Sequence, residues 1–318
     1  MIKMTCRYTE ESAQLQYESH DNCVLCGHEF KEGETIHLGY NLEKTPLYLC
    51  DNCSSELDEV CYRIFFSKRR YLKPDKETKL WRYVDIYKYL SMLLTGGLYF
   101  SRADAFYDTF EGAKGIRRRK HIWDEFYVSF FMDAISHPPD GVEFSKSDEE
   151  KINQAKKLLL DLEKAGKISR QQTYINCWHA NDSESEAMWK AYSNSIPNAL
   201  AIQTTYEKLY DIVGKPNRID IGYVDYIDFG KKFVGVNESF WKKRKSFEYE
   251  REVRAVITKH NSSELGLLVH CDLSKLIENV YISPYAPSWI VQIINDLNNK
   301  YDCKLEVLKS SLVEAPFY

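Results

Sequence analysis

Apolar and polar positions along this chain follow two periods, one near two residues and one near 3.6, and the segments that carry them are interleaved. Alternating or short apolar runs predict strands at residues 80–85, 173–182, 221–228, 246–259 and 266–273. Residues 98–112 are expected to begin as a strand and become a loop, and residues 199–209 to form a strand that runs into a helix. Helical spacing predicts helices at residues 54–72, 86–97, 121–135, 147–166, 184–194 and 288–301. The mixture predicts an α+β fold, with a strand-helix-strand unit near the C-terminus.

Two signals refine the helices. Ser147 and Glu150 have the spacing of a capping box, which predicts a helix start, and Gly166 is the expected end of that helix. The aromatic-rich segment 121–135 is expected to be a core helix.

The segment SFEYEREVRAVITK (246–259) organises the rest of the prediction. Glu248, Glu250 and Glu252 fall at every second position, so a strand would place all three carboxylates on one face, ahead of an apolar run that enters the core. One interpretation is structural, with the carboxylates solvated or paired with Arg251 and Arg254. The other is a carboxylate at the mouth of a cleft, where it can act on a sugar hydroxyl or as a base.

The N-terminal region carries the clearest metal signal. Cys23-x-x-Cys26 and Cys50-x-x-Cys53 are separated by 23 residues. Two such knuckles close a tetrahedral zinc site, so we expect a small zinc ribbon with structural Zn²⁺ and two short strands, 35–40 and 45–49. His28 and His37 are alternative ligands, but four thiolates already complete the coordination shell.

A polar segment that contains Pro74, residues 73–79, predicts the domain boundary. The expected domains are 1–72, the zinc ribbon with its following helix, and 73–318, the α+β domain.

Charge and composition narrow the function classes. The net charge of −4 gives no global attraction to nucleic acid, so any such contact must come from local basic clusters, which occur at 68–70, 117–120 and 242–245. Aromatic residues make up 14% of the chain and suit either a core or a surface that stacks bases. We find no apolar run long enough for a membrane span and no signal-peptide core, and the nine unevenly spaced cysteines favour a reducing cytoplasm.

Phosphate-loop, dinucleotide-fold and metalloprotease motifs are absent from the sequence. Arg82 and Ser101 are polar residues on strands that should otherwise be buried. Cys177 and Trp178 suit core packing, whereas His179 stands at a strand end without a protease-like partner pattern.

Five motifs in this order, LWRYVD, GLYFSRADAFYDTFEG, INCWH, AMWKAYS and FEYEREVR, resemble a widespread bacterial family known as a domain of unknown function. The resemblance covers about residues 80–258. The sequence departs from the family pattern at Tyr107 and Thr109, where Asn and Pro are usual.

That family is similar, more weakly, to ADP-ribosyltransferases, which have a split β-sheet core. The resemblance implies NAD as substrate, with Arg82 or Tyr83 on a first strand, Ser101 or Tyr99 on a second, and Glu252 or Glu250 on a late strand. The predicted catalytic residues are Glu252, Glu250 and Ser101, and the predicted NAD-binding residues are Arg82, Tyr83, Tyr99, Phe106 and Trp178. The glutamate would hold the ribose and stabilise the oxocarbenium ion as nicotinamide leaves.

The resulting hypothesis is an enzyme that transfers ADP-ribose to a macromolecule, with RNA or DNA favoured over protein. The resemblance further implies an intracellular toxin or antiphage effector with a neutralising partner. Two alternatives stay open: a non-catalytic module that binds nucleic acid or protein, and a metal-dependent nuclease in which Asp108 and Glu111 join the carboxylates.

Overall fold

The computed structural model describes residues 22–23, 25–31, 33–40, 46–56, 62–65, 71–137, 147–193, 198–235, 238–260 and 262–318. Contacts divide the chain into two compact units, Met1–Arg70 and Tyr71–Tyr318. The predicted basic cluster 68–70 lies outside the described residues. No helix in these ranges is both long and apolar enough to cross a membrane.

The first unit contains a three-stranded antiparallel sheet in the order β2-β1-β3. Its strands are β1 (Thr35–Tyr40), β2 (Pro46–Leu49) and β3 (Tyr62–Phe65), and the 3-10 helix η1 spans Asp51–Glu56. The two strands predicted here are confirmed. The helix predicted at 54–72 is wrong at Tyr62–Phe65, because these residues pair with β1 instead.

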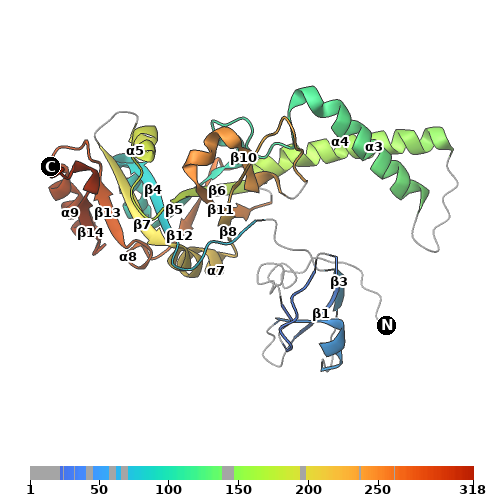
Figure 1. The fold of residues 1–318 in the computed structure, drawn as a ribbon, viewed down its shortest axis with the longest axis horizontal. Helices are drawn as coiled ribbons and strands as arrows, with labels where there is room; N and C mark the ends of the chain where they lie inside the picture. Colours follow the sequence, from blue (N-terminus) through green and yellow to red (C-terminus); the bar gives the residue numbers. More distant parts are fainter. Residues whose placement is uncertain are drawn as a thin grey trace. The chain divides into compact units, whose positions relative to one another are not determined.

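In the described part of the chain, the second unit contains a nine-stranded sheet (Figure 1). Seven strands pair in the order β12-β5-β6-β4-β7-β13-β14, and β11 pairs with both β6 and β8. The strands are β4 (Lys79–Asp85), β5 (Gly97–Arg102), β6 (Thr173–Ala180), β7 (Ala199–Thr205), β8 (Asp220–Tyr223), β11 (Glu252–Thr258), β12 (Gly266–His270), β13 (Asn279–Ile282) and β14 (Glu306–Lys309). A separate parallel pair joins β9 (Asp225–Ile227) to β10 (Lys242–Arg244). Mixed helices and sheet confirm the α+β prediction.

The sheet opens along one edge of β6. β11 pairs with β6 over its whole length on one edge. On the other edge β5 pairs only with Tyr174 and Ile175, and β4 only with His179 and Ala180. Among the described strands, residues 176–178 therefore have no partner on that edge. We call this opening between β4 and β5 the sheet split.

Alternation along the strands sends neighbouring side chains into different cores. Leu80 of β4 belongs to the main core, together with Trp178 and Val253, whereas Trp81 packs with Trp189 of α5 (Glu186–Ser193) on the other side. The remaining helices are α2 (Ile86–Thr95), α6 (Tyr206–Leu209), the π-helical turn η4 (Tyr210–Gly214), α7 (Lys215–Asn217), α8 (Leu273–Leu276) and α9 (Ile290–Lys300). The 3-10 helices are η2 (Ala103–Ala105), η3 (Arg117–Arg119), η5 (Ser239–Trp241), η6 (Lys245–Glu250) and η7 (Ser311–Val313). The predicted C-terminal strand-helix-strand unit is confirmed as β13, α9 and β14.

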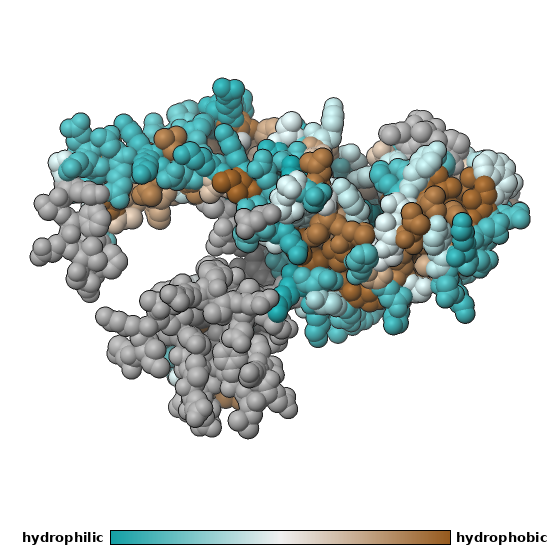
Figure 2. Space-filling view, turned by 180° about the vertical axis from the view of Figure 1, so that it is seen from behind, coloured by the Kyte–Doolittle hydropathy of each residue, from teal (hydrophilic) through white to brown (hydrophobic). Residues whose placement is uncertain are grey.

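Two long helices, α3 (Lys120–Ser136) and α4 (Asp148–Gln172), lie side by side and extend away from the sheet (Figure 1). The capping box of Ser147 and Glu150 is confirmed. Two other expectations are wrong. The helix continues through Gly166, where an added Cβ would meet no atom within 4 Å, and α3 is not a core helix, because only Ile135 is buried among its residues. Figure 2 shows hydrophilic side chains over much of this helix pair, with apolar groups along part of it.

The strand predicted from residue 246 is shorter than expected. Residues 245–250 form η6, and Arg251 has a left-handed φ of 39° that ends this turn before β11 starts at Glu252. Glu248, Glu250 and Glu252 therefore do not share one strand face. Only Glu252 follows the alternation that the sequence suggested.

The close approach of β5 and β12 gives a stability prediction. A Cβ at Gly97 would lie 2.4 Å from the backbone oxygen of Val269, so Gly97→Ala should push the two strands apart and lower the free energy of unfolding by about 2 kcal/mol. Gly166→Ala, in open space inside α4, is the matched control and should raise stability by about 1 kcal/mol. Urea denaturation measures both. Equal effects of the two substitutions would contradict this account of the strand contact.

Candidate functional site

A guanidinium group lies fully buried at the centre of the second unit. Arg254 is 0% exposed, and its neighbours Glu111 and Glu252 are 2% and 3% exposed. The Arg254 guanidinium donates to both Glu111 oxygens at 2.5 and 2.8 Å and to the Oε1 atom of Glu252 at 2.7 Å. It also donates to the backbone oxygen of Phe240 at 2.7 Å. Every side of this cation is therefore matched by an acceptor.

Lys243 extends the arrangement toward the surface. Its Nζ atom lies 3.1 Å from Oε2 of Glu252 and forms an ion pair with Glu250. We call Glu111, Lys243, Glu250, Glu252 and Arg254 the charge cluster. Three carboxylates against two cations leave an excess of one negative charge when all five groups are ionised.

Local structure sets the position of each group. Glu252 and Arg254 are two residues apart on β11, so they project from the same face, opposite His179 and Cys177 of β6. Lys243 is presented by β10, and Glu250 closes η6. Glu111 precedes Gly112, whose φ of 74° allows the chain to turn back after the loop that follows η2.

The cluster shifts the pKa values of Glu250 and Glu252 in opposite directions. Burial by itself would raise the pKa of Glu252, but Arg254 and Lys243 outweigh burial and lower it to about 2. Burial raises the pKa of Glu250, and Lys243 only partly offsets that effect. Glu252 is therefore an anion at any physiological pH, whereas Glu250 is the carboxyl that takes up a proton more readily.

The sheet split gathers polar atoms that have no partner. The NH1 atom of Arg82, Oδ1 of Asn176 and Nε1 of Trp178 are all buried and without a hydrogen bond among the described residues. The Arg82 guanidinium carbon lies 6.0 Å from the centre of the Trp178 ring. Burial lowers the pKa of Arg82, with Cys177 and Tyr192 acting in the opposite direction. An unsatisfied guanidinium in such a place is costly unless a ligand engages it.

Ser101, predicted as catalytic, and the other residues predicted for NAD binding are dispersed around β6. Tyr83 is buried, and its hydroxyl accepts a hydrogen bond from the backbone N–H of Ser185 at 2.8 Å. Ser101 lies on β5 opposite Ile175, and Tyr99 of the same strand is 53% exposed. Phe106 packs in a small cluster with Ile175 and Cys177. The structure thus brings Arg82 to Trp178, and Glu250 to Glu252, while Ser101, Tyr99 and Phe106 lie on the β5 side.

Sequence reasoning did not identify the cations of the charge cluster as a unit. The spacing of Glu252 and Arg254 on one strand face was a usable signal for that pair. No local signal marked Glu111, which contacts Arg254 across 143 residues of sequence. Lys243 was not distinguished either, because it is one of several lysines in a basic turn.

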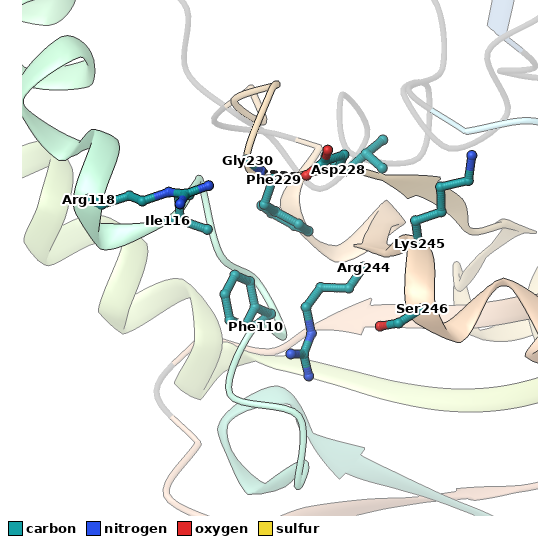
Figure 3. Close-up of a pocket in the computed structure, with 10 residues that line it drawn as sticks. Phe110, Ile116, Arg118, Asp228, Phe229, Gly230, Arg244, Lys245 and Ser246 are labelled. Carbon is teal, nitrogen blue, oxygen red and sulfur yellow. Dashed lines mark hydrogen bonds between the residues drawn. The ribbon is translucent and has the colours of Figure 1, made fainter.

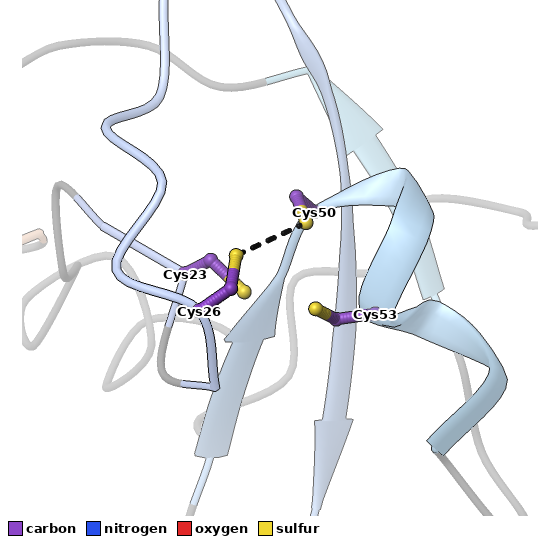
Figure 4. Close-up of side chains that lie close together, drawn as sticks. All are labelled: Cys23, Cys26, Cys50 and Cys53. Atoms are coloured by element: carbon purple, nitrogen blue, oxygen red, sulfur yellow. Dashed lines mark hydrogen bonds between the residues drawn. The ribbon is translucent and has the colours of Figure 1, made fainter.

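The four predicted cysteine ligands come together in the first unit (Figure 4). The Sγ atoms of Cys23, Cys26, Cys50 and Cys53 all lie within 4.8 Å of one another. A tetrahedron with Zn–S bonds of about 2.3 Å has sulfur–sulfur edges of about 3.8 Å, so the group fits such an ion. Burial raises the pKa of Cys23, but N–H groups of the two knuckles outweigh it and lower this pKa to about 6, which favours the thiolate.

The two histidines in the described part of this unit, His28 and His37, have carboxylate partners instead. His28 lies 2.7 Å from Glu34, and His37 lies 2.8 Å from Asp51. Neither belongs to the cysteine group.

We compared the chain with protein-family models, curated proteins and solved structures, and only the solved structures gave matches. No protein-family model matches the chain, and no curated protein matches it. Three solved structures of DarT from Thermus sp. 2.9 are similar at low levels. The complex with NAD+ has 9% identity and a TM-score of 0.34, and covers 76% of this chain and 100% of that one. The complexes with ADP-ribosylated ssDNA and with carba-NAD+ have 10% and 9% identity and TM-scores of 0.35 and 0.33. They cover 77% and 74% of this chain and 100% and 97% of those chains. TM-scores of this size do not establish a common fold, so function rests on the chain's own residues.

The charge cluster predicts a defined pH dependence of stability. The pKa of Glu252 falls from its usual 4.5 to about 2 on folding, so its contribution is complete above pH 4.5 and is lost as the pH falls toward 2. Glu252→Gln should lower the free energy of unfolding by about 3 kcal/mol at pH 7, because Arg254 loses a buried counter-charge. The difference from the wild type should shrink below pH 4.5.

Urea denaturation at pH 7, 4.5 and 3 measures this difference. Glu248→Gln, an exposed carboxylate in the same segment, should change little at any pH. A penalty for Glu252→Gln that stays constant from pH 7 to 3 would count against an ionised Glu252.

Proposed function

We propose that this protein is an NAD-dependent ADP-ribosyltransferase that transfers ADP-ribose to a nucleic acid. One observation carries the proposal: the NH1 atom of Arg82, buried without an acceptor among the described residues, lies at the sheet split, and a carboxylate with a lowered pKa, Glu252, lies on the strand paired to the other edge of β6. Cys177 of β6 interacts electrostatically with both side chains.

The sheet split offers the groups that the donor requires. The NAD diphosphate needs a cation, and at the sheet split the buried NH1 atom of Arg82 has no acceptor among the described residues, whereas Arg254 and Lys243 are already paired. The carboxamide of the nicotinamide ring has one acceptor and one donor group. The free Nε1–H of Trp178 can donate to the acceptor, and Oδ1 of Asn176 can accept from the donor.

The two glutamates are suited to different steps. A carboxylate that stays ionised can stabilise the positive charge that develops on the ribose as nicotinamide leaves, which fits Glu252. Glu250, whose pKa is raised by burial, is the better group to take a proton from the acceptor. This division assigns an electrostatic role to Glu252 and a general-base role to Glu250. Ser101 remains a prediction as a catalytic residue, and Tyr83, Tyr99 and Phe106 remain predictions as NAD-binding residues.

A nucleic-acid acceptor is favoured by the two basic segments in the second unit, 117–120 and 242–245, of which the second adjoins η6 and Glu250. Action as a toxin or antiphage effector, a neutralising partner and a cytoplasmic location stay predictions from the resemblance.

A second candidate is a nucleic-acid-binding module without catalytic activity. The ion pairs of Glu252 with Arg254 and of Glu250 with Lys243 favour it, since both carboxylates then serve the fold alone.

The metal-dependent nuclease is less favoured. Glu111 is held by Arg254 and Asp108 by Arg244, and neither belongs to a potential metal-binding group among the described residues.

The transferase proposal predicts separate effects of two substitutions. Glu250→Gln should lower transfer of label from adenylate-labelled NAD to single-stranded nucleic acid by at least about 100-fold with NAD binding retained, because the base is lost. Arg82→Met should weaken NAD binding by about tenfold or more, because the diphosphate loses its cation. Thermal shift with NAD and label transfer measure the two effects.

Lys79→Met, an exposed position on the same strand as Arg82, is the control and should leave both properties unchanged. Wild-type protein that binds nucleic acid but neither binds nor consumes NAD would favour the non-catalytic module.

We also propose that the four cysteines hold structural Zn²⁺, since the four thiolates fill the tetrahedral shell and leave no open position for catalysis. Purified protein should contain about one zinc per chain by elemental analysis. Cys23→Ser should reduce that content and expose the first unit, Met1–Arg70, to proteolysis, whereas Cys303→Ser, which lies in the second unit, should leave the zinc content unchanged. A metal-free wild type with the same protease resistance would disprove the assignment.

A further inference from the structure

A cavity of about 420 Å³ lies in the second unit, apart from every residue predicted as catalytic or NAD-binding (Figure 3). Its volume is within the range of roughly 300–1,000 Å³ that small-molecule sites occupy. The lining comes from four separate segments: the loop before Glu111, the start of η3, the end of β9 with the residues that follow it, and the junction of β10 with η6.

One wall of the cavity is aromatic. The rings of Phe110 and Phe229 meet edge to face with their centres 5.3 Å apart, and the Arg244 guanidinium lies 4.7 Å from the centre of the Phe110 ring. Flat faces of this kind pack against planar ligands, and nucleobases are the commonest planar groups that stack on phenylalanine and arginine.

The rim of the cavity is cationic. Arg118 and Lys245 are exposed, and neither has an ion-pair or hydrogen-bond partner among the described residues. In Figure 3 Arg118 reaches in from the η3 side, opposite Arg244 and Lys245. Asp228 is the single carboxylate among the ten lining residues and can accept from the amino group of a base.

The cavity and the charge cluster share two short pieces of backbone. Phe110 lines the cavity while the next residue, Glu111, holds Arg254. Arg244 lines the cavity while the preceding residue, Lys243, pairs with Glu250 and Glu252. A ligand in the cavity would therefore lie against the same segments that position the proposed catalytic carboxylates.

We infer that this cavity binds one nucleotide of a single-stranded nucleic acid, with the base against the aromatic wall and the phosphates between Arg118 and Lys245. The inference rests on the proposed function, because this single-stranded nucleic acid would be the acceptor of ADP-ribose. An acidic peptide fits the site less well, because it would use the cations but leave the aromatic wall without a planar partner.

Binding of fluorescent 20-nucleotide single strands, both DNA and RNA, tests the inference by anisotropy without NAD. Arg118→Glu/Lys245→Glu should weaken binding by at least about tenfold, because the phosphates lose two cations. Lys167→Glu/Lys304→Glu, two exposed lysines away from the cavity, changes the net charge equally and should leave binding within about twofold.

Phe110→Leu should weaken binding by about tenfold through lost stacking. Its melting temperature shows whether the variant remains folded.

Each outcome has a defined meaning. Equal weakening by the two charge variants, or binding of a free mononucleotide without binding of the strands, overturns the inference. NAD consumption is measured in parallel. NAD consumption without binding of the nucleic acid would disprove only the acceptor site. Nucleic-acid binding that depends on the cavity, without NAD consumption, would support the site and disprove the transferase proposal.

Discussion

The structure depends on one buried cation. Arg254 has no exposed surface, so its charge must be matched inside the protein, and Glu111 and Glu252 do so together with the backbone oxygen of Phe240. These partners belong to a loop, to β11 itself and to η5, which are distant in the sequence. Such a buried arrangement adds little net stability compared with apolar packing, but it is strongly selective, because displacing any one partner leaves a charge uncompensated. The fold around the proposed site is thereby held in a single arrangement.

The same arrangement divides the chemistry between two nearby glutamates. Arg254 and Lys243 keep Glu252 ionised, whereas burial makes Glu250 easier to protonate. Two glutamates, two residues apart in the chain, therefore differ in pKa because of their surroundings alone. Arg251, in a left-handed conformation between them, ends η6 before β11 begins, so Glu250 does not continue the alternation of β11.

β6 connects the parts of the proposed site. Its residues 176–178 border the sheet split with Arg82, and its Cys177 and His179 face the strand that carries Arg254 and Glu252. The cavity adjoins the charge cluster through shared backbone at residues 110–111 and 243–244. A donor at the sheet split and an acceptor in the cavity would thus approach the charge cluster from different elements, which suits a transfer reaction between two substrates.

The sequence by itself determined the features that depend on neighbouring residues. The spacing of apolar residues located most strands, the Cys-x-x-Cys pairs predicted the group of four cysteines, and Ser147 with Glu150 marked the start of α4. Local pattern was misleading at Gly166, which α4 tolerates, and at the aromatic helix α3, which lies largely at the surface. Only the tertiary structure decided that Glu111 meets Arg254 across 143 residues, that β4 and β5 separate along β6, and that Phe110 and Arg244 share a cavity. The physical reason is that helix and strand propensities act over a few residues, whereas the pairing of buried charges is set by which distant segments the packed core brings into contact.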